Sequence, residues 1–141
     1  MPDKFYHYVM ESESATHEFN SAEARAKKLD AHMRMLEEVL EDWAAYGLLG
    51  LCPGELITWF LDLIVFDLAR LDADDFHRVA ARVNMDLTTF LGTEWADMPA
   101  KGGVRRVAHK LVAATSDVSM ADATLFYLST RGLKACLERF I

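Results

Sequence analysis

The sequence predicts an all-α protein, a compact bundle of five to seven helices around a central apolar helix at about residues 53–71. Residues 22–43 place apolar side chains at alternating spacings of four and three, and residues 53–71 are apolar on nearly all sides. Proline, glycine and capping residues divide the remainder into segments of helical length. With 141 residues, of which 52% are hydrophobic, the chain can bury the core of one domain.

Two regions are expected along the chain. Residues 1–19 combine an aromatic run, Phe5–Met10, with a polar stretch, Glu11–His17, and are expected to form an N-terminal arm, a short strand or a loop. Residues 20–141 contain no linker rich in proline or glycine and are expected to form a single helical domain.

The first long helix is expected to begin at Asn20, with Glu23 completing a capping box, and to end at Gly47. Its apolar residues form a heptad seam that has two interpretations. The helix either packs on the core of its own chain or pairs with a second copy in a homodimer. The residues of this possible dimer seam are Leu29, Met33, Leu36, Leu40 and Trp43.

The central helix is expected to begin at Pro53, since proline fits the first helical position, with Glu55 in the first turn. A third helix begins after Asp72 and is expected to end at Asn84. A short fourth helix runs over residues 86–91 and stops at Gly92, and residues 93–102 are expected to form a loop.

The last part of the chain predicts three further helices. The fifth covers roughly residues 104–114, with four apolar side chains inside. The sixth begins at Ser119, where Asp122 supplies a capping pattern. Gly132 separates it from a last short helix at residues 133–140. The residues expected inside the fifth helix are Val104, Val107, Ala108 and Leu111.

Carboxylates in the central helix are the strongest candidates for chemistry. Asp62 and Asp67 lie ~140° apart around the helix and do not share a face, whereas Glu55 and Asp62 do. They are expected to form a polar edge or to pair with Arg70, Arg105 or Arg106. An enzyme that uses Glu55, Asp62 and a histidine is the third hypothesis for function. The sequence predicts no catalytic and no cofactor-binding residue. It predicts no metal-ligating residue either, because no histidine has a histidine or cysteine at i+3 or i+4.

The chain has two cysteines, Cys52 and Cys136, which are expected to be buried free thiols. The start of the sequence lacks the pattern of a secretory leader. The apolar stretch at 56–71 contains two aspartates, and at ~16 residues it is shorter than the ~20 that a bilayer needs. A cytoplasmic location without membrane contact is therefore expected.

The net charge of −7 is unevenly distributed. Residues 1–75 hold 16 acids and 6 bases, whereas residues 76–141 hold 6 acids and 9 bases. An acidic face is expected on the first helix, formed by Glu37, Glu38, Glu41 and Asp42. The favoured hypothesis is a non-enzymatic protein, a small bacterial or phage-encoded regulator or inhibitor, that docks this face on a basic partner protein, for example one that binds nucleic acid.

Residues 71–91 carry a resemblance. In lambda-repressor-like helix-turn-helix domains a helix of pattern L-x-R-I-A-x-x-L turns at glycine or asparagine into a short L-x-x-L-L helix. Residues 71–91 resemble these last two helices, with Phe76 and Ala80 in the first helix, Asn84 in the turn and Leu87 in the second.

The resemblance implies an alternative function, a DNA-binding transcriptional regulator with a helix-turn-helix-like element at 72–95. A basic patch would then contact DNA phosphates. The residues of this patch are Arg78, Arg82, Arg105, Arg106 and Lys110.

Overall fold

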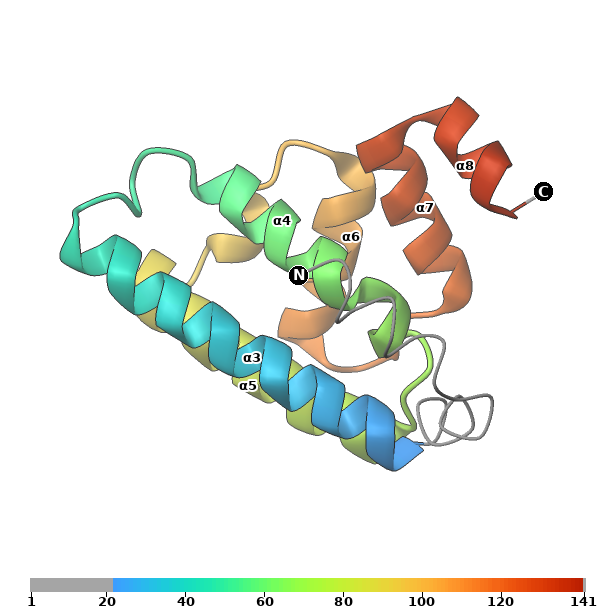
Figure 1. Ribbon diagram of the computed structural model, residues 1–141, viewed down its shortest axis with the longest axis horizontal. Helices are drawn as coiled ribbons and strands as arrows, with labels where there is room; N and C mark the ends of the chain where they lie inside the picture. Colours follow the sequence, from blue (N-terminus) through green and yellow to red (C-terminus); the bar gives the residue numbers. More distant parts are fainter. Residues whose placement is uncertain (1–21, 141) are drawn as a thin grey trace, which may run out of the picture.

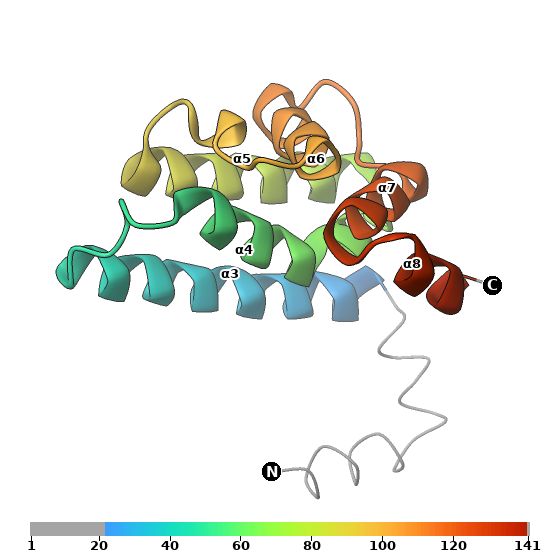
Figure 2. The ribbon, with the colours of Figure 1, turned by 90° about the horizontal axis from the view of Figure 1, so that it is seen from above.

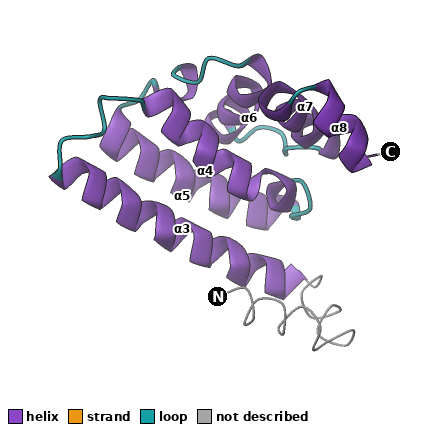
Figure 3. Cartoon of the chain, turned by 45° about the horizontal axis from the view of Figure 1, so that its top comes forward, coloured by secondary structure: helices purple, strands orange, loops and turns teal. Residues whose placement is uncertain are grey.

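The computed structural model describes residues 22–140, and over this range the chain contains helices and loops but no strand (Figure 3). The predictions for residues 1–19 and for the cap at Asn20 lie outside the described range. The expected all-α bundle is confirmed. The helices are α3 (Ala22–Ala45), α4 (Pro53–Leu68), α5 (Ala73–Leu91), α6 (Gly102–Ala113), α7 (Met120–Arg131) and α8 (Leu133–Phe140), with a short 3-10 helix, η1 (Trp95–Asp97), between α5 and α6.

The three long helices α3, α4 and α5 lie along the long axis of the molecule (Figure 1). Helices α3 and α5 run in the same direction and α4 runs in the opposite one, and α3 packs against both of the others (Figures 1 and 2). Helix α6 packs against α4, α5 and α7, and α8 packs on α7. The described helices therefore enclose one common core.

Helix α4 forms the centre of this core, as expected. It begins with proline in its first turn and buries apolar side chains along its whole length. These side chains are Leu56, Ile57, Phe60, Leu61, Ile64, Val65 and Leu68. Burial of such side chains is the main favourable term in folding, at about 1.5–3 kcal/mol each.

The apolar seam of α3 is part of the same core. Leu29, Met33, Leu36 and Leu40 have no exposed surface within the single chain, because α4 and α5 cover them. The alternative of a homodimer seam through these residues is therefore wrong. Trp43, the last residue of the seam, is only partly buried.

Local capping signals set most helix ends where they were expected. At the end of α3, Gly47 has a positive φ of 69°, and the Leu48 amide donates to the Trp43 carbonyl at 2.8 Å. Together with the bond from Gly47 to Ala44, this is a Schellman motif. The Asp72 carboxylate caps α5, and Ser119 with Asp122 forms a complete capping box at α7.

The expected break at Asn84 is wrong, because α5 is one continuous helix from Ala73 to Leu91. Asn84 instead accepts a hydrogen bond from the Trp95 indole at 2.9 Å and one from the Thr88 hydroxyl at 3.2 Å. Apolar residues at helical spacing continue through this point to the buried Leu87. The turn that the helix-turn-helix resemblance implies is therefore absent from residues 73–91.

Candidate functional site

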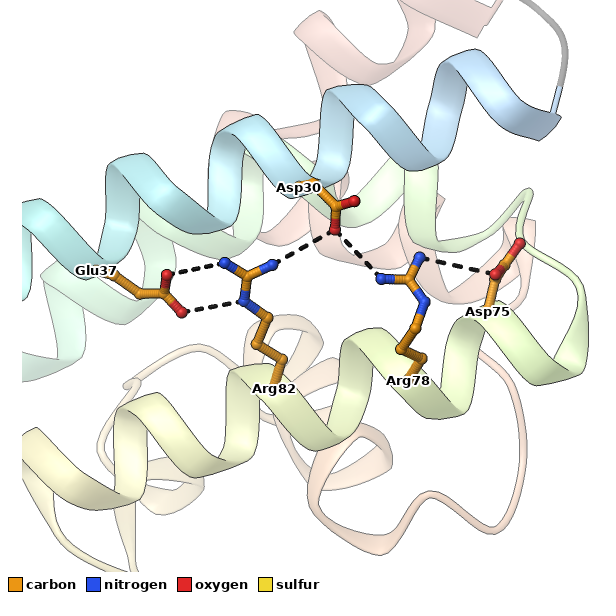
Figure 4. A network of polar contacts seen from close by, with 5 residues as sticks. All are labelled: Asp30, Glu37, Asp75, Arg78 and Arg82. Atoms are coloured by element: carbon orange, nitrogen blue, oxygen red, sulfur yellow. Dashed lines mark hydrogen bonds and ion pairs between the residues drawn. The ribbon is translucent and has the colours of Figure 1, made fainter.

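The expected acidic and basic surfaces partly neutralise each other between α3 and α5 (Figure 4). Two guanidinium nitrogens of Arg82, Nη2 and Nε, donate to the two oxygens of the Glu37 carboxylate, at 2.8 and 3.0 Å. Asp30 accepts hydrogen bonds from Arg82 at 3.4 Å and from Arg78 at 3.2 Å. Glu37 is thus an internal partner of α5 and does not belong to a free acidic face.

Asp86 lies beside this network and carries an unusual charge state. Burial, together with the neighbouring carboxylate of Glu37, raises the pKa of Asp86 to about 7. Its Oδ2 atom is buried without a hydrogen-bond partner. The hydrogen bonds from Arg82 hold the pKa of Glu37 below its usual value, so Asp86 is the member of the pair that takes up a proton first as the pH falls.

The expected basic patch does not form one surface. Arg78 and Arg82 lie on α5 against α3, whereas the other three residues lie on α6. Arg105 pairs with Asp97 at 3.7 Å, and Arg106 and Lys110 both reach the buried Asp122, at 2.7 and 2.5 Å. All five cations thus have carboxylate partners inside the molecule, so a continuous DNA-facing patch is not present among them.

Asp122 joins α6 to the start of α7. Its side chain is 2% exposed and accepts hydrogen bonds from Arg106, Lys110 and the Ser119 amide. Burial alone would raise the pKa of Asp122, but these donors together hold it well below its usual value. Asp122 therefore remains ionised inside the protein and has a structural role.

The other three acids of the expected acidic face lie at the surface. Glu38, Glu41 and Asp42 are exposed and fall within an arc of about 100° on the side away from the seam. The chain from residue 35 to residue 69 contains seven acids and no lysine, arginine or histidine. We use the name acidic end for Glu38, Glu41, Asp42 and Glu55, which lie in the last turns of α3 and the first turn of α4, on either side of the loop that joins the two helices.

An apolar cleft of about 400 Å³ lies beside the acidic end, between α3 and α4. Both tryptophans of the cleft are partly accessible, and the Trp59 residue is 41% exposed. Tyr46 and Leu51, in the adjoining loop, are 79% and 74% exposed. The cleft is lined by Val39, Trp43, Cys52, Glu55, Leu56 and Trp59.

The cleft was not anticipated from the sequence, because Trp43 and Trp59 belong to helices whose other apolar residues are buried. The available signal was local. The stretch 46–51 places tyrosine and three leucines among glycines, in a short loop that leaves Tyr46 and Leu51 exposed. Exposed aromatic and aliphatic side chains at one place are typical of binding surfaces.

A larger pocket of about 590 Å³ adjoins the cleft and tests the enzyme hypothesis. Glu55 and Asp62 both line it, but no histidine lies among its lining residues. Asp62 pairs with Arg131 at 2.6 Å, and Asp67 pairs with Lys28 at 3.2 Å. The expected partners Arg70, Arg105 and Arg106 are wrong, because α7 and α3 supply the cations that face these aspartates.

The other candidate ligands are dispersed. Cys52 is half-buried, Cys136 is buried, and both are free thiols. The Nε2 atom of His109 lies 2.8 Å from the Asp97 carboxylate on the surface of α6. Over residues 22–140, no three side chains of histidine, cysteine, aspartate or glutamate are placed to hold one metal ion.

Within the described range, no helix has both the length and the hydropathy that a membrane span requires. Comparison of this chain with protein-family models, with curated proteins and with solved structures finds no match. The acidic end and the apolar cleft beside it are therefore the candidate functional site on geometric grounds.

Proposed function

We propose that this protein is a non-enzymatic protein-binding domain that docks a basic partner protein on its acidic end and apolar cleft. The observation that supports this proposal is the juxtaposition of exposed acids, in a stretch of sequence without bases, with an open cleft that contains two tryptophans. Such a protein would act as a regulator or inhibitor, because it competes with the usual ligand of the basic surface that it covers.

The two parts of the site have different roles in binding. Exposed acids attract a basic partner over roughly a Debye length, ~8 Å at physiological salt, and so raise the association rate. Aromatic side chains that become buried supply most of the affinity at typical interfaces. Trp59 and Trp43 are placed for this role because both keep accessible surface in the unbound chain.

The shape of the cleft favours a helical segment of the partner. It lies between two antiparallel helices, and a third amphipathic helix can lay its apolar side chains into such a groove. The partner segment would carry apolar residues at spacings of three and four, flanked by lysine or arginine. These cations would face Glu38, Glu41 and Asp42.

The test is an affinity capture from a lysate of the source organism with nuclease treatment and a salt series. Captured proteins are identified by mass spectrometry, and the purified partner is then titrated directly. The variant Glu38→Lys/Glu41→Lys/Asp42→Lys should weaken binding at least 100-fold, since three attractive contacts become repulsive. Trp59→Ala should weaken binding with little change in its salt dependence.

The matched control changes net charge equally at a distance from the site. The variant Asp74→Lys/Asp117→Lys/Glu138→Lys alters three exposed acids and should retain binding. Equal loss of binding in both triple variants would show that only total charge matters and would overturn the docking site. Recovery of nucleic acid alone, lost as salt rises, would overturn the proposal in favour of DNA binding.

A further inference from the structure

A third, chemically different pocket is lined by residues of α3, α4, α7 and α8, toward the C-terminal end of α4. Its volume is about 240 Å³, and four cations from four separate segments line it. They are Lys28, Arg70, Arg131 and Arg139. A convergence of cations is unexpected in a chain whose net charge is −7.

The carboxylates at this pocket neutralise only half of the positive charge. Asp62 pairs with Arg131 at 2.6 Å, and Asp67 pairs with Lys28 at 3.2 Å. Arg70 and Arg139 have no carboxylate partner within residues 22–140. Two positive charges in excess therefore line a small, partly open pocket.

Aromatic contacts hold one of these two guanidinium groups. The Arg139 guanidinium lies 4.5 Å from the ring centre of Phe66 and 5.0 Å from that of Tyr127. The three rings of Phe66, Tyr127 and Phe140 pack on each other at centroid distances of 5.7 to 6.1 Å. Stacking engages the face of a guanidinium and leaves its N–H groups, which lie in the plane, to bind an acceptor.

We propose that this pocket binds a phosphate group carried by a small molecule. A phosphate dianion balances the two unpaired cations, and its oxygens can accept from the two guanidinium forks at the same time. Phe66 and Leu63, which also line the pocket, provide apolar contact for the remainder of the ligand. This site is separate from the proposed protein-docking function.

The test uses inorganic phosphate as the probe and follows amide resonances of the full chain by NMR. Phosphate should give saturable shifts around the pocket, whereas chloride at matched ionic strength should not. Arg70→Gln should weaken phosphate binding about tenfold, the typical loss for one charge-assisted contact. Arg139→Lys keeps the charge but loses the planar fork, and it should weaken binding too.

The control is Arg34→Gln, an exposed arginine of α3 that does not line the pocket and should leave phosphate binding unchanged. If Arg139 variants fail to fold, Arg70→Gln still decides the question, because Arg70 is exposed and outside the core. Shifts that rise linearly without saturation, or that persist in Arg70→Gln, would overturn the site. Arg70→Gln should not affect capture of the protein partner, so the two proposals can fail separately.

Discussion

Substitution of Gly103 tests how closely α6 and α7 pack. A Cβ atom at Gly103 would lie 2.6 Å from the Leu125 carbonyl oxygen and closer still to the Ser129 hydroxyl oxygen. The first distance is about 0.8 Å short of ordinary contact, and the atom it meets is backbone, which cannot rotate away. Gly103→Ala should therefore force the two helices apart and lower the free energy of unfolding by about 2–3 kcal/mol.

The neighbouring Gly102 provides a matched control in the same helical turn. No atom lies within 4 Å of a Cβ built there, so Gly102→Ala should raise the free energy of unfolding by about 0.5 kcal/mol through helix propensity. Urea unfolding followed by far-ultraviolet circular dichroism measures both effects. Adding Ser129→Ala to Gly103→Ala should restore less than half of the loss, because the Leu125 carbonyl remains. Equal stability of the two alanine variants would refute the close packing.

Three further predictions concern charge and burial. The raised pKa of Asp86 makes the stability of the wild-type protein fall as the pH rises from 4 to 7. Asp86→Asn should therefore make the protein about 1–2 kcal/mol more stable at pH 8. A pH series of urea unfolding experiments should show a smaller dependence of stability on pH in this variant than in the wild type. Asp122→Asn should cost about 2 kcal/mol at neutral pH. This cost should shrink steadily as the pH falls below about 4, since the stability contributed by the lowered pKa of Asp122 is lost there; a constant loss at all pH values would contradict the assigned role. Leu36→Lys should unfold the chain, because it buries a charge in the core, and the helical circular dichroism signal should be lost. A folded variant whose mass in light scattering differs from that of the wild type would instead support the dimer interpretation.

Helix ends could be predicted from sequence because capping is local. Pro53, Asp72, Ser119 and Gly132 each mark an end through contacts within a few residues. The prediction that the third helix ends at Asn84 was wrong because it also rested on a local signal. Its local tendency to end a helix is weak, and the apolar positions on both sides of it, together with the Trp95 indole, favour a continuous helix.

The site could be predicted only in part. Exposure of Glu38, Glu41 and Asp42 follows from their position opposite the apolar seam. The pairing of Glu37 with Arg82 spans 45 residues and depends on the parallel alignment of α3 with α5, for which the sequence offers no local signal. The pocket at Arg70 and Arg139 likewise requires four segments to converge.

The two candidate sites differ in charge: exposed acids form one, and an excess of cations lines the other. Helix α4 is about 24 Å long, with the acidic end at its first turns and the excess of arginine at its last. In the field of a charged partner such a molecule rotates before it makes contact, so a basic surface meets the correct pole first. At low ionic strength the same asymmetry favours transient head-to-tail chains of this protein, which salt should disperse.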